Sequence, residues 1–280
     1  MQSDAHVSGS GNVGTPAVRA VLSHAGLKLK SVIVSSADKE GRDAGELAGV
    51  EPCGVAATRD WQATLSAGCD ALVYSATADT RPEEALTELL ACLSAGINVV
   101  APGFYFYLDP ESSPPEALAP IEAACEESGA SLFVSGIDPG GVMDMLPVAV
   151  SGAVADIREI RAREIFNSAL YDQPHVVREV IGFGKPMDEL PLMLHDFAIE
   201  MVWAPMLRAV GDGLGAPVES IELAVERRPL EQDVEVPGMG RFEAGTQGAF
   251  RFEVRGMHGG QARYVLEHVT RIDDACAPDW

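Results

Sequence analysis

The chain has 280 residues, which is enough for two domains of ordinary size and a substantial buried core. Its formal net charge of −22 repels nucleic-acid phosphates and anionic lipid headgroups, so neither nucleic acid nor a membrane surface is an expected partner. No apolar run approaches the roughly 20 residues of a membrane helix, so we expect a globular protein that acts on a small-molecule substrate.

The N-terminal segment and the cysteines bear on the cellular compartment. Residues 1–7 contain neither a basic leader nor an apolar stretch, so no secretory signal is predicted and we expect a cytoplasmic protein. The five cysteines are scattered and form no Cys-x-x-Cys pair, and no histidine stands beside them at metal-ligand spacing. We therefore predict free thiols and no metal site.

Short apolar runs alternate with helical patterns through the first half of the chain. The runs are residues 6–8, 29–35, 71–76, 97–101 and 131–135. Between them, residues 15–25 and 82–95 carry apolar side chains at helical spacing. Strands that are apolar nearly throughout and are joined by helices predict an α/β fold, with a Rossmann-type parallel sheet in a dinucleotide-binding domain of residues 1–138.

A glycine-rich loop follows the first predicted strand and opens the first predicted helix. Its residues, the first candidates for cofactor binding, are Gly9, Ser10, Gly11, Asn12, Val13 and Gly14. In a dinucleotide site the first glycine allows the tight turn, the second admits the pyrophosphate, and the third allows close packing of helix on strand. A plain tight turn is the alternative, and the strand–loop–helix context favours the dinucleotide site.

The end of the second predicted strand bears on the choice of cofactor. NAD sites commonly carry an acidic residue there to hold the ribose hydroxyls, and none stands at that position. Hydroxyl and basic side chains follow instead and predict NADP, with candidate 2′-phosphate contacts at Ser35, Ser36, Lys39 and Arg42. The two basic residues could equally solvate a loop, and Asp38 leaves NAD possible.

Ligands of open parallel sheets bind beyond the carboxyl ends of the strands. The loops expected there are residues 75–79, with Ala76 and Thr77 as further cofactor contacts, residues 101–107, and residues 135–141. Tyr105 and Tyr107 are candidate proton donors to a carbonyl or imine. Packing between domains is an equally good explanation of this aromatic stretch.

The second half of the chain has a different pattern. Helices are predicted at residues 144–154, 176–182 and 191–212, with strands at 157–166, 220–226, 249–255 and 262–270. Alternating side chains in the last strands predict an α+β domain over residues 139–280 with a mainly antiparallel sheet. His175 is a candidate acid or base and His195 a weaker one, although an ordinary structural histidine is more common.

Several segments together resemble the dihydrodipicolinate-reductase-like oxidoreductases, which include 2,4-diaminopentanoate dehydrogenase and the native amine dehydrogenases. They are the glycine loop, residues 36–45, the Pro-Gly-x-x-x-Asp segment within residues 136–144, and Gly-Phe-Gly-Lys-Pro at 182–186. The resemblance implies a Rossmann domain, a second α+β domain, hydride transfer at a carbon that bears an amine or carbonyl, and a homodimer.

Two departures from the family pattern leave other functions open. Amine-active members carry a glutamate after the strand that corresponds to residues 98–100, and this chain has aromatic residues at 104–107 instead. Family members also look longer, and this chain ends at Trp280. The alternatives are a non-catalytic dinucleotide-binding or redox-sensing module and, less favoured, a lyase or isomerase that uses bound nicotinamide only transiently.

Overall fold

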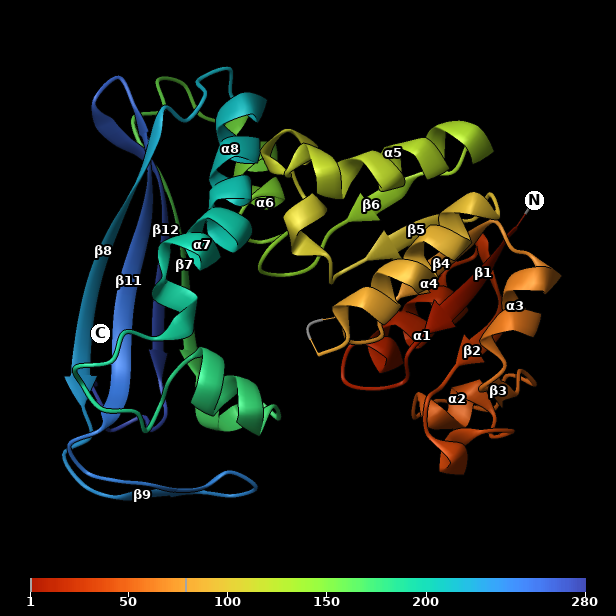
Figure 1. The fold of residues 1–280 in the computed structure, drawn as a ribbon, viewed down its shortest axis with the longest axis horizontal. Coiled ribbons are helices and arrows are strands. Elements are labelled where there is room, and N and C mark those ends of the chain that lie inside the picture. Colours follow the sequence, from red (N-terminus) through yellow and green to blue (C-terminus); the bar gives the residue numbers. More distant parts are fainter. Residues whose placement is uncertain (1, 79) are drawn as a thin grey trace. The chain divides into compact units, whose positions relative to one another are not determined.

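The computed structural model describes residues 2–78 and 80–280, and it divides into two compact units, Met1–Ile137 and Asp138–Trp280. Figure 1 shows the elements of each unit. The described residues include no helix with the length and apolar character that a bilayer crossing needs.

The first unit is built on a six-stranded sheet. Its strands are β1 (Ser3–Ser8), β2 (Leu27–Ile33), β3 (Ala57–Thr58), β4 (Ala71–Tyr74), β5 (Asn98–Ala101) and β6 (Leu132–Val134). All neighbouring strands are parallel, in the order β3-β2-β1-β4-β5-β6. This is the strand order of the doubly wound dinucleotide-binding fold, so the predicted Rossmann-type sheet is confirmed.

Helices cover this sheet and bury its apolar strands. They are α1 (Gly14–Ser23), α2 (Ala44–Leu47), α3 (Trp61–Ala67), α4 (Pro82–Ser94) and α5 (Pro115–Ser128), with single 3₁₀ turns at Ala37–Lys39, Tyr105–Tyr107 and Pro110–Ser112. One apolar core includes residues of α1 and α2, and a second includes residues of α4 and α5. Separate cores of this kind explain why the strands read as continuous apolar runs.

The second unit contains a four-stranded sheet in the order β7-β12-β11-β8. Its elements are α6 (Met145–Ser151), β7 (Ile160–Asn167), α7 (Asp196–Ala198), α8 (Ala204–Gly213), β8 (Ser220–Pro229), β9 (Val234–Val236), β10 (Gly240–Phe242), β11 (Gln247–His258) and β12 (Gln261–Arg271). The β8–β11 and β11–β12 pairs are antiparallel, whereas β7 runs parallel to β12. The predicted α+β class is confirmed, and α7 and α8 lie on the same side of the sheet (Figure 1).

The long helix predicted over residues 191–212 is wrong as a single element. The structure has a 3₁₀ turn at Leu192–Leu194, then α7, a π-helical stretch at Ile199–Trp203, and α8. His195 adopts an extended backbone with ψ 149°, which separates the 3₁₀ turn from α7. The apolar periodicity continued through this break, so periodicity alone could not reveal it. Shorter turns complete the unit at Ser168–Leu170 and Val176–Val180.

Candidate functional site

The glycine loop joins β1 to α1, with backbone geometry that only glycine permits at two positions. Gly9 has φ +106° and donates its amide to the carbonyl of Ile33 at 2.9 Å. A Cβ on Gly9 would lie 2.8 Å from the carbonyl oxygen of Ser75, and one on Gly14 would lie 2.1 Å from the carbonyl oxygen of Gly9. The loop is therefore held close to the ends of β2 and β4.

The centre of the loop is open. A Cβ on Gly11 would meet no atom within 4 Å, and Gly11, Asn12 and Val13 are exposed. The helix that follows begins at Gly14, and the amides of Thr15 and Ala17 in its first turn donate to the carbonyls of Gly11 and Val13. Pro16 has no amide hydrogen, so the amide of Gly14 is the one left for an anion in this turn. Amides at a helix N-terminus and open space over a glycine are the two features that a bound diphosphate requires.

Two of the predicted 2′-phosphate contacts, Lys39 and Arg42, follow the end of β2. Lys39 donates from Nζ to the carbonyl oxygen and to Oγ of Ser10, each at 3.2 Å. The exposed Arg42 donates its backbone amide to the carbonyl of Lys39 at 3.2 Å. The structure thus gathers Ser10, Lys39 and Arg42 near the end of β2.

Arg59 is a residue of this region that the sequence analysis did not identify. It follows β3, whose pairing with β2 sets Thr58 opposite Ile33. Arg59 donates from Nε to the carbonyl oxygen of Ser35 at 3.0 Å, and its side chain is 49% exposed. A strand of two residues leaves almost no periodic signal, so only the parallel pairing could have revealed this neighbour.

Asp38 opposes the positive charges in this region. Its carboxylate accepts a hydrogen bond from the hydroxyl of Ser36. This hydrogen bond and the nearby charges of Lys39 and Arg42 hold the pKa of Asp38 below its usual range. Asp38 is therefore ionised at neutral pH, and an anion bound at Ser36 would approach a negative charge.

The loop after β4 is anchored at one of its predicted contacts. Arg81 donates from Nε to the carbonyl oxygen of Thr77 at 3.1 Å, and its guanidinium binds the carboxylate of Glu88 at 2.8 and 2.9 Å. Ala76 is half-buried and Thr77 is exposed, while Asp79 of the predicted loop lies outside the described residues.

The two candidate tyrosines occupy different environments. Tyr107 is 6% exposed, and its hydroxyl donates to the carbonyl oxygen of Ala117 at 3.1 Å. Burial raises the pKa of Tyr107 above its usual range. Tyr105 is half-buried and packs edge-on against Phe106 at 5.9 Å. The hydroxyl of Tyr107 is thus bonded within the core.

The other candidate residues lie in the second unit. His175 is exposed and precedes the π-helical turn at Val176–Val180. Asp144 of the family-like segment is buried, and its carboxylate accepts from the amides of Gly140, at 2.8 Å, and Met145. These contacts give Asp144 a structural role at the start of α6.

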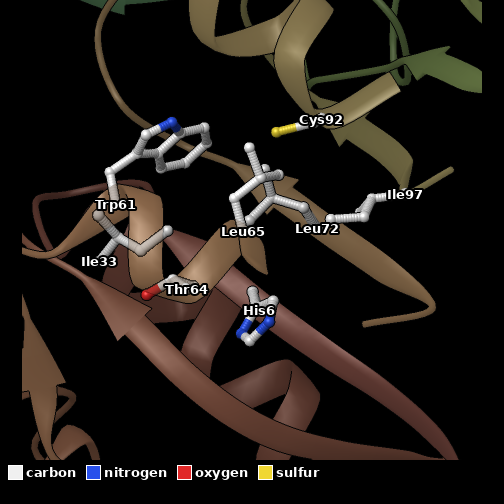
Figure 2. A pocket seen from close by; sticks show the side chains of 8 residues that line it. All are labelled: His6, Ile33, Trp61, Thr64, Leu65, Leu72, Cys92 and Ile97. Atoms are coloured by element: carbon white, nitrogen blue, oxygen red, sulfur yellow. The ribbon is translucent and has the colours of Figure 1, made fainter. Parts of the chain in front are cut away.

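A small cavity in the first unit is too small for a cofactor. Figure 2 shows the side chains that line it, with the imidazole of His6 among mainly apolar groups. Its volume is about 10 Å³, which is room for one water molecule. His6 Nε2 is buried without a hydrogen-bond partner in the described chain, and burial lowers the pKa of His6. A bound water would satisfy this nitrogen.

Comparison with known proteins shows that the chain belongs to the dihydrodipicolinate-reductase-like oxidoreductases. The N-terminal family model of dihydrodipicolinate reductase matches residues 5–103. The chain is 46% identical to an amine dehydrogenase of Streptomyces virginiae over 275 residues, which are 98% of this chain and 76% of that protein. It is 25% identical over 171 residues to 2,4-diaminopentanoate dehydrogenase of Acetoanaerobium sticklandii, across 59% of this chain and 46% of that one.

Solved structures agree on the fold. The structure of an amine dehydrogenase from Mycobacterium smegmatis superposes with a TM-score of 0.72 at 21% identity. The match covers 98% of this chain and 80% of that one. The same succession of parallel-sheet and antiparallel-sheet units is therefore present in a protein of that activity.

Proposed function

We propose, since this chain belongs to the dihydrodipicolinate-reductase-like oxidoreductases, that it transfers hydride between a nicotinamide dinucleotide and the amine-bearing carbon of a small molecule. The chain is a dinucleotide-dependent oxidoreductase by family. In the oxidative direction the substrate carbon gives up hydride to the oxidised nicotinamide and its nitrogen loses a proton, which leaves an imine that water hydrolyses to a carbonyl and ammonia. The similarity to amine dehydrogenase supports an amine, with an imine or carbonyl in reverse.

One observation carries the cofactor site. The glycine loop leaves open space over Gly11, while Gly9 and Gly14 hold the turn against β4 and α1. A diphosphate in that space would meet the amide of Gly14 at the start of α1. The nicotinamide supplies the hydride when the cofactor is bound, and the protein residues hold the diphosphate and the ribose.

We propose NADP rather than NAD as the preferred cofactor. Lys39, Arg42 and Arg59 provide positive charge around Ser35 and Ser36. Asp38 acts in the opposite sense, because its carboxylate remains charged beside Ser36. Glu40 also lies 3.9 Å from the guanidinium of Arg59, so three cations stand against two anions, and the remaining positive charge favours a bound 2′-phosphate.

The cofactor preference predicts opposite effects of two substitutions. Arg59→Ala is expected to weaken NADPH binding about 5–10-fold and leave NADH binding unchanged, because a charge-assisted hydrogen bond to phosphate is lost. Asp38→Asn is expected to strengthen NADPH binding several-fold. Titration of the nicotinamide fluorescence measures both affinities, and Arg19→Ala, which removes an arginine bonded to the carbonyl of Ala48, is the control. Equal losses of NADPH and NADH affinity in Arg59→Ala would reject the assignment.

We propose Tyr105 as the proton donor or acceptor in place of the family glutamate. Tyr105→Phe is expected to lower kcat about 100-fold, the usual contribution of a general acid or base, without changing NADPH affinity. Tyr107→Phe is expected to leave kcat within about two-fold and to lower Tm, because its hydroxyl bonds a buried carbonyl. Steady-state rates on a panel of amines and imines, with thermal unfolding of both variants, separate the two roles. Unchanged kcat in Tyr105→Phe would eliminate this residue.

The missing glutamate favours one other function, a dinucleotide-binding module without turnover. Residues 104–107 place Phe104 and Tyr107 in the core of the first unit, where Phe104 has no proton to transfer and the hydroxyl of Tyr107 is bonded to the carbonyl of Ala117. NADPH binding without oxidation or reduction of any compound in the panel would support this alternative. His175 remains a candidate acid or base on the second unit, and the same panel tests a variant at that position.

We propose a homodimer in the cytoplasm. The sheet face of the second unit that carries Arg161, Arg163, Arg251 and Arg255 also carries Ile165, which is 53% exposed. An exposed apolar side chain among charged residues on one sheet face suits a contact with the same face of a second copy. The five cysteines are unpaired, which suits a reducing compartment. Light scattering is expected to give twice 29.6 kDa, and Ile165→Glu to give a monomer while Ile137→Glu does not.

A further inference from the structure

A row of side chains crosses the sheet of the second unit at the middle of β12. His268 lies opposite Phe252 of β11 on one side and opposite Glu164 of β7 on the other. Residues directly opposite one another share a sheet face, so all three project on the same side. The ring of His268 stacks on that of Phe252, with centroids 4.6 Å apart and planes at 7°. Trp203 packs edge-on against His268, with centroids 5.7 Å apart.

The imidazole of His268 has an incomplete set of hydrogen bonds. The residue is 5% exposed, and its Nε2 lies 2.7 Å from Oδ2 of Asp138 and 3.3 Å from the indole nitrogen of Trp203. An indole nitrogen only donates, so an Nε2 that accepts from Trp203 has no hydrogen to give to Asp138. In the described chain, His268 Nδ1 and Asp138 Oδ1 are buried and have no hydrogen-bond partner. A positive centre would satisfy the Nε2–carboxylate contact.

Glu164 adds a second carboxylate to this pair. Ligand atoms of Asp138, Glu164 and His268 all lie within 4.8 Å of one another. Burial raises the pKa of Glu164, and the negative charge of Asp138 raises it further, while His268 lowers it. Two carboxylates at this distance repel each other unless a proton or a cation lies near them.

We propose that Asp138, Glu164 and His268 bind a divalent transition-metal ion, with Zn²⁺ or Mn²⁺ as the best fit to one imidazole and two carboxylates. The two carboxylates balance the charge of a divalent ion. The imidazole nitrogen favours a transition metal over Mg²⁺ or Ca²⁺, because those two ions prefer oxygen ligands. The proposal goes beyond the hydride-transfer function and concerns residues of the second unit alone.

The distances are compatible with such an ion after small side-chain rotations. Ligands about 2.0–2.2 Å from a tetrahedral ion stand about 3.3–3.6 Å from one another. The distance between His268 Nε2 and Asp138 Oδ2, now 2.7 Å, would increase to this value. Distances between ligand atoms that are now as long as 4.8 Å would decrease to it. The three ligands come from the segment before Pro139, from β7 and from β12, so an ion would fasten that segment to the sheet.

No metal site is predicted from the sequence, because the chain has no metal ligands close to one another along the sequence. Asp138 and His268 are 130 positions apart and meet only because β12 pairs in parallel with β7, next to the start of the unit. No local motif connects them, and the candidate histidines predicted from the sequence, His175 and His195, do not include His268.

Metal binding can be measured on the full chain without nucleotide or substrate. After treatment with EDTA and removal of any affinity tag, titration with Co²⁺ is expected to give visible d–d absorption that saturates at one equivalent. Excess Zn²⁺ or Mn²⁺ is expected to raise Tm by about 5 °C or more, because the ion binds only the folded state. Elemental analysis of the untreated protein gives the metal that it carries.

Two ligand variants and one control make the measurement specific. Glu164→Gln and His268→Gln are expected to abolish the Co²⁺ spectrum and the Tm increase. His258→Gln, which alters another histidine of the same hairpin, beside Glu219 at 3.8 Å, is expected to retain both. If His268→Gln fails to fold, Glu164→Gln decides alone. Absence of saturable Co²⁺ absorption in the wild type, or an unchanged metal response in Glu164→Gln, would overturn the proposal and leave a buried histidine–carboxylate pair.

Discussion

Gly14→Ala is expected to eliminate detectable binding of NADPH and to lower the stability of the first unit by about 2–4 kcal/mol. The new Cβ would lie 2.1 Å from the carbonyl oxygen of Gly9, so the backbone of the loop must move. Because the neighbouring atom is backbone rather than the end of a flexible side chain, the loop and α1 cannot both keep their positions. Fluorescence titration gives the loss of affinity, and thermal unfolding the loss of stability.

Gly11→Ala separates the cofactor site from the fold. A Cβ at this position meets no atom of the chain within 4 Å, so Tm should not change. NADPH affinity should still fall about 30-fold, because the methyl group takes the space that the pyrophosphate needs. Gly152→Ala, in the second unit, is the control for both measurements, since its Cβ meets only an atom at 4.0 Å. Wild-type affinity in both the Gly11 and Gly14 variants would place the dinucleotide elsewhere.

The parallel sheet could be predicted because its signals are local. Each strand of the first unit is a short apolar run, and the glycine loop stands between one such run and a helical pattern. Register and neighbours are different, since they depend on pairing between distant segments. Arg59 reaches Ser35 only through the pairing of β3 with β2, and a strand as short as Ala57–Thr58 gives no periodic pattern.

The roles of individual side chains were harder to predict than the loops that hold them. Tyr105 and Tyr107 are two positions apart, and the sequence offered both as proton donors. The 3₁₀ turn after Phe104 directs Tyr107 into the core, where its hydroxyl meets the carbonyl of Ala117. Nothing within the turn itself distinguishes the two, because the burial of Tyr107 depends on how the turn packs against α5.

Alternation in the last strands correctly predicted one apolar face of the sheet in the second unit. It also predicts that the polar face is exposed to water, and part of that face is buried. Strict alternation is typical of a sheet with one face in water. Glu267 lies on the polar face of β12 and is only 1% exposed, because arginines from the neighbouring strands surround it. The parallel partner β7 supplies two of them, Arg161 and Arg163, and that pairing could not be predicted from the sequence of β12.

Glu267→Gln is expected to destabilise the second unit by about 3 kcal/mol at neutral pH. The carboxylate of Glu267 lies 2.8 Å from Arg163, 3.0 Å from Arg161 and 3.0 Å from Arg251. Removing one partner of a buried ion pair leaves the opposite charges unbalanced, and the low end of the usual range applies because these arginines are a third or more exposed. Urea unfolding of both proteins measures the difference, and Glu200→Gln, in an exposed pair with Arg208, should cost less than about 0.5 kcal/mol.

The pH dependence of that difference tests whether charge is the cause. Burial alone would raise the pKa of Glu267, but hydrogen bonds from Arg163 and Arg161 prevail and lower it. A carboxyl whose pKa is lower in the folded state stabilises the fold above its unfolded pKa of about 4.3, and this contribution is lost as pH falls through the folded value. The stability difference between wild type and Glu267→Gln should therefore be constant from pH 6 to 8 and shrink below about pH 4. A difference that stays constant through the acid range would mean that the glutamine is tolerated poorly for its packing, and that the arginines around position 267 do not need its charge.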